Sequence, residues 1–140
     1  QEVIAASAEI AAHLNLNAGD DVLHIERLRL ADNRPIVFEE RYLNPQLCLE
    51  LVTEDVETQS IHWLLVHKYK LPLVRVTHTV EIREAGEWGE VLGVGSADQI
   101  FAVARLTYTK QAGKTHPAVY YRAFYHGDEY QFKAQFNTMI

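Results

Sequence analysis

The sequence predicts an α+β domain, in which about six antiparallel strands form one sheet and short helices lie on one of its faces. Segments rich in β-branched and aromatic residues recur along the 140-residue chain, separated by residues that favour turns. Between them lie shorter segments with apolar residues at helical spacing. Short turns join several neighbouring strands, so the strands are expected to pair antiparallel.

The N-terminal third is expected to contain one helix and one hairpin. A helix is predicted over 7–14, with Ser7 as its N-cap. Residues 16–20 have the composition of a turn. Strands over 21–30 and 35–43 then form an antiparallel pair around the short turn between them.

The rest of the chain alternates between helical and extended segments. Helical structure is predicted over 47–52, 60–69 and 85–92, and strands over 73–82, 99–109, 118–125 and 130–136. Ser60 is expected to cap the second of these helices and Gly93 to end the third.

Length and composition favour one soluble domain over residues 1–140, because 48% of the residues are hydrophobic, enough for a single core. Cys48 is the one cysteine, so no internal disulfide can form, which fits a cytoplasmic protein. No apolar segment approaches the ~20 residues of a membrane span, so no membrane partner is expected. The chain begins at Gln1 rather than Met, which is consistent with the removal of an upstream region.

The charge of the chain argues against direct DNA binding. The net charge is −6, from 13 basic and 19 acidic residues. A nucleic-acid-binding domain normally has a basic face, because neutralising phosphates supplies much of its affinity. Here the basic residues are scattered, and only 68–70 is locally dense. This chain by itself is not expected to bind DNA.

Arg27 and Arg29 are the strongest candidates for ligand binding. Residues two apart on a strand point to the same face, so both guanidiniums are expected on one face of the hairpin with Glu39 opposite. Planar guanidiniums bind carboxylates and phosphates through two parallel hydrogen bonds. The alternative is a pair of surface arginines in ion pairs with Glu26 and Glu39. The apolar character of the strand favours partners in a buried setting for these arginines.

Other candidates are weaker when each is taken alone. Ser60 at a helix start is suited to an anion, but taken alone it is better explained as a plain N-cap. His62 follows in the first turn and is either an oxyanion donor or an ordinary half-exposed histidine. Arg105 interrupts an apolar strand and either pairs with Glu39 or lines the same pocket. The aromatic run of the next strand, which includes Tyr125, is mostly core with one or two hydroxyls available to a ligand.

Sequence signals for catalysis are weak. The chain has no Gly-x-Ser-x-Gly elbow, no P-loop, no full dinucleotide fingerprint and no His-x-x-x-His or His-Glu-x-x-His pair. We therefore predict no catalytic residue, no metal site and no cofactor.

An ordered series of short segments runs through nearly the whole chain: Ala11–Val22, Arg27–Arg29, Pro35, Glu39, Tyr42–Leu43, Ser60–Leu65, Leu92–Val94, Ala104–Tyr108 and Tyr125–Phe132. In this order and spacing they resemble the UTRA domain, the effector-binding half of HutC-type GntR-family transcription regulators. The resemblance implies a chorismate lyase-like fold with a ligand pocket between sheet and helices. It also implies a homodimer and an N-terminal winged-helix DNA-binding domain, which is absent from this chain.

The resemblance also implies roles for individual residues. In members that bind phosphorylated sugars, the positions of Arg27, Arg29 and Ser60 hold the anionic group, while Glu39 and Tyr125 correspond to an acid and a tyrosine of the pocket. Two positions depart from the family pattern, namely His62 in place of an aromatic residue and Val119 in place of an acid. These departures disfavour an amino-sugar phosphate and favour a small carboxylate or phosphate metabolite with a less polar body.

The resulting prediction is an effector-sensing and dimerisation domain of a bacterial transcriptional regulator, which binds a small anionic metabolite and modulates DNA binding by an attached domain. Two alternatives stay open. One is a chorismate lyase-like enzyme on the same fold, since fold does not determine function. The other is a purely structural dimerisation module in which the arginines form internal ion pairs.

Overall fold

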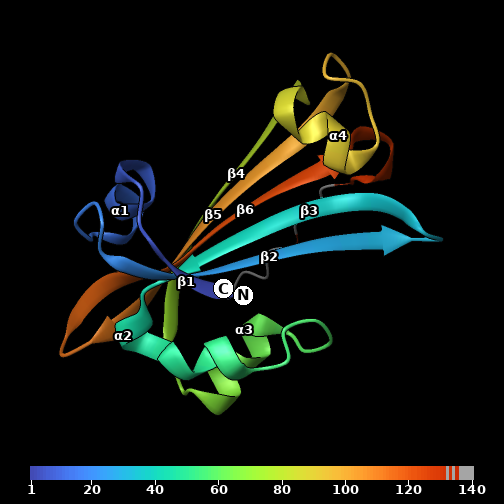
Figure 1. Cartoon of the computed structure of the whole chain (residues 1–140). Coiled ribbons are helices and arrows are strands. Elements are labelled where there is room, and N and C mark those ends of the chain that lie inside the picture. Colours follow the sequence, from blue (N-terminus) through green and yellow to red (C-terminus); the bar gives the residue numbers. More distant parts are fainter. Residues whose placement is uncertain (132, 134, 136–140) are drawn as a thin grey trace, which may run out of the picture.

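The computed structural model describes residues 1–131, 133 and 135, and within them the chain forms one antiparallel sheet of six strands (Figure 1). The strands are β1 (Glu2–Ala5), β2 (Asp21–Ala31), β3 (Arg34–Leu43), β4 (Leu73–Glu84), β5 (Gln99–Gln111) and β6 (Lys114–His126). Their order across the sheet is β1-β2-β3-β6-β5-β4. The pairing of β3 with β6 therefore joins an N-terminal hairpin to a C-terminal one at the centre of the sheet.

Tight turns form both of these hairpins. Asp32 and Asn33 between β2 and β3 have φ values of 49° and 63°, and Ala112 and Gly113 between β5 and β6 have φ values of 49° and 76°. Positive φ at both central residues matches the two-residue type I′ turn, whose twist fits that of the strands it joins. Short turns of this kind set the strand register, which decides the residues that face one another on the sheet.

The helical segments are short: α1 (Ala8–Leu14), α2 (Pro45–Cys48), the 3-10 helix η1 (Leu49–Thr53), α3 (Ile61–Trp63), the π-helical turn η2 (Leu64–Lys68), the 3-10 helix η3 (Gly86–Trp88), α4 (Gly89–Leu92) and the 3-10 helix η4 (Gly127–Glu129). Both predicted caps are observed, since the Ser7 and Ser60 hydroxyls accept hydrogen bonds from the N–H groups of Ile10 and Trp63. No helix in the described part of the chain is long and apolar enough to cross a membrane.

Helices pack on both faces of the sheet, whereas the sequence predicted them on one. The segment from α2 to η2 packs on one face, which we call the arginine face, in a buried cluster that includes Ile25, Leu43, Ile61, Leu64 and Val119. On the other face, which we call the opposite face, α1 and α4 cover two further clusters (Figure 1). Side chains alternate between the two faces of a strand, and the central strands are apolar on both, so each face needs cover.

The predicted fold class, an antiparallel α+β sheet with short helices, is confirmed. The strands predicted between 21 and 125 correspond to β2 through β6, and the predicted helical segments are all present. The four-residue β1 was not predicted, because it is short and forms by pairing with the free edge of β2. The strand predicted over 130–136 is not formed at residues 130, 131, 133 and 135, and its other residues lie outside the described part of the chain.

Candidate functional site

Strand register assembles a polar cluster at the centre of the arginine face. Arg27 on β2 lies opposite Glu39 on β3, as the sequence predicted. Two residues after Glu39 on β3, Arg41 lies opposite Tyr121 on β6. Tyr121 in turn lies opposite Arg105 on β5. Because alternate residues of a strand share a face, these two rows are neighbours on the same surface.

Glu39 is the centre of this cluster. Its Oε1 accepts hydrogen bonds from Arg27 Nε at 2.6 Å, Arg41 Nη1 at 3.1 Å and Arg29 Nε at 3.3 Å. Its Oε2 accepts a hydrogen bond from the Tyr121 hydroxyl at 3.1 Å. Within the described residues, three guanidiniums therefore surround one buried carboxylate.

The cluster is buried at its centre and exposed at one edge. The side chains of Glu39, Arg27 and Arg41 are only 4%, 13% and 12% exposed, whereas that of Arg29 is 55% exposed. Burial by itself raises the pKa of Glu39, but the positive charges of Arg41, Arg27 and Arg29 outweigh it and hold that pKa below its ordinary value. Glu39 is thus an ionised anchor that orients the arginines.

Arg27 is held in place from two sides. Burial, together with the neighbouring positive charges of Arg41 and Arg29, lowers its pKa against the opposing effect of Glu39. Its Nη1 also donates to the backbone carbonyl of Val56 at 3.2 Å, which ties β2 to the loop before α3. The guanidinium is therefore fixed in one orientation.

Tyr121 extends the cluster across the sheet. The Arg41 and Arg105 guanidinium carbons lie 4.5 and 4.6 Å from the centre of its ring. Its hydroxyl also lies 3.4 Å from that of Tyr125. Burial and the charge of Glu39 raise the pKa of Tyr121, so it is a neutral hydrogen-bond donor.

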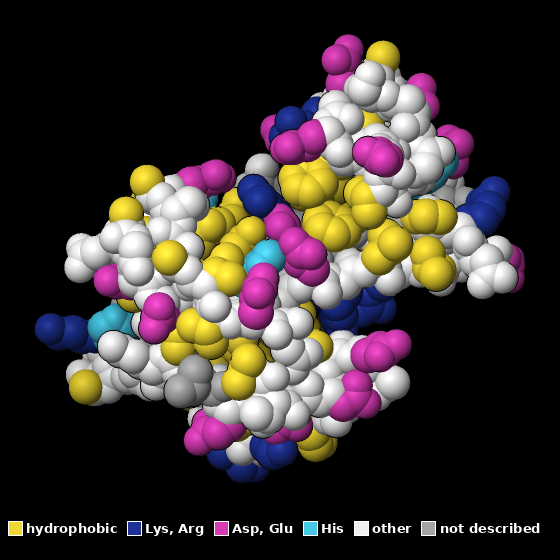
Figure 2. Space-filling model, viewed as in Figure 1, with side chains coloured by type: hydrophobic (Ala, Val, Ile, Leu, Met, Phe, Trp, Pro, Cys, Tyr) yellow, Lys and Arg dark blue, Asp and Glu magenta, His cyan; other side chains and the backbone are white. Residues whose placement is uncertain are grey.

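Two hollows adjoin the cluster. The first, of about 810 Å³, lies between the distal part of β2 and the loop before α3 and is lined by Arg27, Arg29, Val56, Thr58 and Ser60 among others. Figure 2 shows Lys and Arg side chains gathered in the hollow between β2 and the helical layer that contains α3. The second, of about 320 Å³, lies under α3 and is lined by Arg41, His62, Arg105, Val119 and Tyr121 among others.

The structure therefore places every predicted site residue on one side of the sheet. Arg27, Arg29 and Glu39 are in direct contact, while Arg105 and Tyr125 reach Glu39 only through Tyr121. Ser60 lines the first hollow and His62 the second. Of the two alternatives for Arg105, an ion pair with Glu39 is not seen among the described residues, and Arg105 lines the second hollow rather than the first, which Arg27 and Arg29 line. Ser60 also acts as a plain N-cap.

Sequence reasoning missed Arg41, and it placed Tyr121 in an aromatic run that faces the less polar part of a ligand, without linking it to Glu39. Arg41 follows Glu39 by two residues on a strand, so the spacing itself indicates a shared face. Tyr121 had no such signal, because its position beside Glu39 depends on β6 pairing with β3, more than 70 residues away along the chain. On the opposite face, the side chains of His24, Glu26 and Glu40 lie close together, and their types can ligate a metal ion.

Comparison with known families gives the chain an identity. Residues 1–131 match the model of the UTRA domain. The chain belongs to the UTRA domain family. The family predicted from the ordered series of short segments is thereby confirmed, and the match includes every residue of the arginine cluster.

Solved structures of regulator domains share the fold of this UTRA domain. The ligand-binding domain of a protein described as a GntR-family regulator, from Bordetella bronchiseptica, has 26% identity and a TM-score of 0.79, covering 97% of this chain and 87% of that one. The C-terminal domain of the histidine utilization repressor from Pseudomonas syringae has 22% identity and a TM-score of 0.84, covering 98% and 94%. A GntR-family transcriptional regulator from Bacillus cereus has 19% identity and a TM-score of 0.84, covering 97% and 93%. The last two comparisons show likeness of fold.

Proposed function

We propose that this UTRA domain binds a small anionic metabolite at the arginine cluster and acts as the effector-binding and dimerisation domain of a GntR-family transcriptional regulator. The observation that carries the proposal is the charge of the cluster. Glu26 and Glu57 also line the first hollow. Within the described residues, however, the guanidiniums of Arg27, Arg29 and Arg41 all contact one carboxylate, that of Glu39, and Arg105 lines the second hollow. An anion would offset this excess positive charge.

The difference in exposure among the arginine side chains supports a specific mode of binding. Arg27 and Arg41 are largely buried and held by Glu39, whereas Arg29 is half exposed and contacts Glu39 through Nε. In our proposal the carboxylate or phosphate of the ligand binds Arg27, Arg29 and Ser60 in the first hollow. The less polar part of the ligand faces Tyr121 and its neighbours under α3, where Val119 and Leu65 supply apolar surface and His62 a polar group.

The electrostatics support binding rather than catalysis. A general acid or base works best with a pKa near the working pH. The pKa of Glu39 is held low and that of Tyr121 is raised, so neither exchanges a proton readily near neutrality. Incubation with chorismate tests the rival enzyme, and formation of an aromatic acid would favour it.

In the proposed regulator, the domain pairs with a second copy and is attached to a winged-helix domain that contacts DNA in the cytoplasm. The ligand can change the affinity for DNA only if it binds one arrangement of the attached domains more tightly than the other. The difference between these two ligand affinities sets the size of the change. The mass of the domain in solution, measured by light scattering, tests the dimer.

The deciding experiment is a thermal-shift screen of the chain against sugar phosphates, small dicarboxylates, aromatic acids and urocanate. A ligand at a hundredfold its dissociation constant stabilises the fold by about 2.7 kcal/mol. We expect the shift to be lost in Arg29→Ala and kept in Arg83→Ala, which removes an exposed arginine of β4 on the opposite face. A ligand that stabilises both variants equally would show that the arginine cluster is not its site. A panel without any effect would favour the structural dimerisation module.

A further inference from the structure

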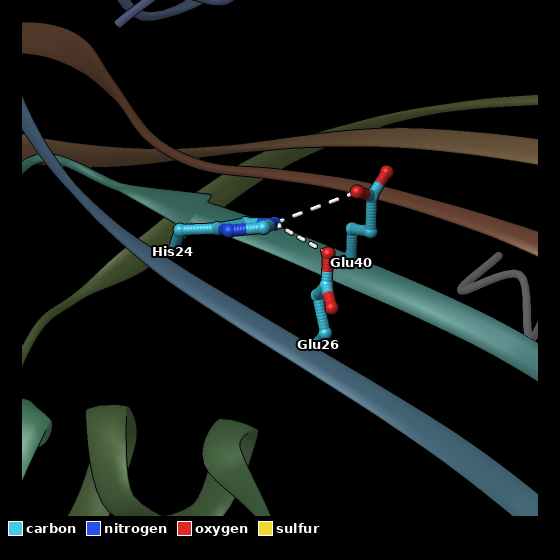
Figure 3. A group of neighbouring side chains, drawn as sticks. All are labelled: His24, Glu26 and Glu40. Carbon is cyan, nitrogen blue, oxygen red and sulfur yellow. Dashed lines mark ion pairs between the residues drawn. The ribbon is translucent and has the colours of Figure 1, made fainter. Parts of the chain in front are cut away.

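A second group of polar side chains lies on the opposite face of the same hairpin. His24 and Glu26 are two residues apart on β2, and Glu40 on β3 is the register partner of Glu26. The three side chains therefore share one face, with ligand atoms that all lie within 4.8 Å of one another. Figure 3 shows the His24 ring pointing toward both carboxylates.

The Nε2 atom of His24 is buried without a hydrogen bond. Its side chain is 10% exposed, and His24 Nε2 has no hydrogen-bond partner, although it points at Glu26 and Glu40. Buried polar atoms are rarely left in this condition, because the loss of hydration is then uncompensated. The ring is also held in place, since it stacks on Tyr42 with the ring centres 4.5 Å apart.

The spacing of the three groups suits a metal ion better than a hydrogen bond. His24 Nε2 lies 3.4 Å from Glu40 Oε1 and 3.7 Å from Glu26 Oε1. Hydrogen bonds between nitrogen and oxygen are typically about 2.9 Å long. Two ligand atoms that are each about 2.1 Å from a tetrahedral Zn²⁺ are separated by about 3.4 Å.

The charges around the group also favour a cation. Carboxylates directly opposite each other on neighbouring strands repel, and Glu26 faces Glu40 in this way. Arg122 donates to Glu40 Oε2 and the Tyr42 hydroxyl donates to Glu40 Oε1 at 3.2 Å, which orients that carboxylate. For Glu26, the contact in the described structure is with His24 alone. Apart from His24, therefore, no basic side chain pairs with Glu26 among the described residues.

The group is open to solvent on one side. The Glu26 side chain is 56% exposed, while that of Glu40 is 6% exposed. Figure 2 shows a histidine side chain beside acidic ones at the surface between α1 and α4. An ion can thus reach the carboxylates from outside while the imidazole and Glu40 form the buried base of the site.

We propose that His24, Glu26 and Glu40 bind one divalent transition-metal ion, with Zn²⁺ as the best match. One imidazole nitrogen and two carboxylate oxygens supply three ligands, and water takes the fourth position. Tyr42 and Arg122 hold the Glu40 ligand in place, as partners beyond the ligands do in other metal sites. The bound ion links β2 to β3 on the face that is opposite the arginine cluster.

Calorimetric titration of the chelator-treated chain with Zn²⁺ tests the proposal. We expect one ion per chain, and at least tenfold weaker binding in Glu26→Gln, whose exposed position leaves the fold intact. The matched control is Glu84→Gln, which removes an exposed acid at the end of β4 and should bind as the wild type does. Co²⁺ provides a second readout, because an ion held by these ligands gives the intense visible absorption of tetrahedral geometry.

Two results would overturn the proposal. The first is the absence of saturable Zn²⁺ binding by the wild type. The second is binding of equal strength in the wild type and in both Glu26→Gln and His24→Gln, which would place the ion on other surface histidines. Circular dichroism of each variant separates loss of the ion from loss of the fold.

Discussion

Arg27 and Glu39 face each other in register across β2 and β3, with Arg27 Nε 2.6 Å from Glu39 Oε1. The pair joins the centre of the sheet to the loop before α3, because Arg27 also donates to the carbonyl of Val56. The same carboxylate that orients Arg27 also orients Arg29 and Arg41. The arrangement of the arginines, and with it the ligand binding proposed for this site, therefore depends on one acid.

Removing the charge of Glu39 should destabilise the fold. In Glu39→Gln the guanidiniums of Arg27 and Arg41 remain largely buried without their counter-charge, and breaking a buried ion pair in this way costs about 3 kcal/mol or more. Urea unfolding of the variant measures the loss. Glu84→Gln, at an exposed acid, should change the free energy of unfolding little. A comparable small effect for Glu39→Gln would mean that the cluster contributes nothing to stability.

Arg41→Ala should weaken anion binding, although the sequence did not single out this residue. Arg41 lines the hollow under α3 and contacts both Glu39 and Tyr121. Loss of a hydrogen bond to a charged group costs about 1.5–3 kcal/mol, so affinity should fall about tenfold or more. An NMR titration with the anionic metabolite that the thermal-shift screen identifies measures the dissociation constant, because the less polar part of that ligand is proposed to lie in the hollow that Arg41 lines. Equal affinities in Arg41→Ala and the control Arg83→Ala would exclude a role for Arg41.

Tyr121→Phe should lower the free energy of unfolding, because it removes one hydrogen-bonded hydroxyl. Tyr121 donates to Glu39 Oε2, and its removal leaves a buried carboxylate oxygen without this donor. A loss of about 1–3 kcal/mol in the free energy of unfolding is expected. The neighbouring Tyr120 is buried on the opposite face, where its ring stacks on His13. Tyr120→Phe should cost less than Tyr121→Phe, and the reverse order would argue against the Glu39–Tyr121 hydrogen bond.

Acid should remove the contribution of Glu39 to stability. In the folded chain its pKa lies below the ordinary value of 4.5, because Arg41, Arg27 and Arg29 outweigh the effect of burial. The unfolded state therefore binds the proton more tightly, so the stabilisation is fully present above the unfolded pKa and is lost as the pH falls through the folded one.

Urea unfolding of the wild type and of Glu39→Gln, from about pH 6 to about pH 3, checks this expectation. The difference in unfolding free energy between the two should shrink on acidification. The carboxyls of Glu54 and Asp55 also have lowered pKa values, but they are present in both proteins and cancel in the difference. A difference that stays constant with pH would contradict the assignment.

Local chemistry made much of this protein predictable. Turn residues and capping serines determine where strands and helices begin and end, so the boundaries of β2 to β5 follow closely from the sequence, whereas β6 begins at Lys114, four residues before the predicted start. The period of two along a strand was enough to bring Arg27, Arg29 and Glu39 to one face. A spacing of two also links Glu39 to Arg41, and His24 to Glu26, although metal-binding motifs such as His-x-x-x-His have the spacing of a helix.

The sequence alone determined the family, the antiparallel class and the first three members of the arginine cluster, because these depend on interactions between residues close along the chain. The tertiary structure alone decided that the Tyr121 hydroxyl binds Glu39, that Arg105 lies over the Tyr121 ring, and that helices cover both faces of the sheet. Each of these depends on strand order and register, above all on the pairing of β3 with β6. Such a pairing is fixed by the packing of the whole core and has no signal in any short segment.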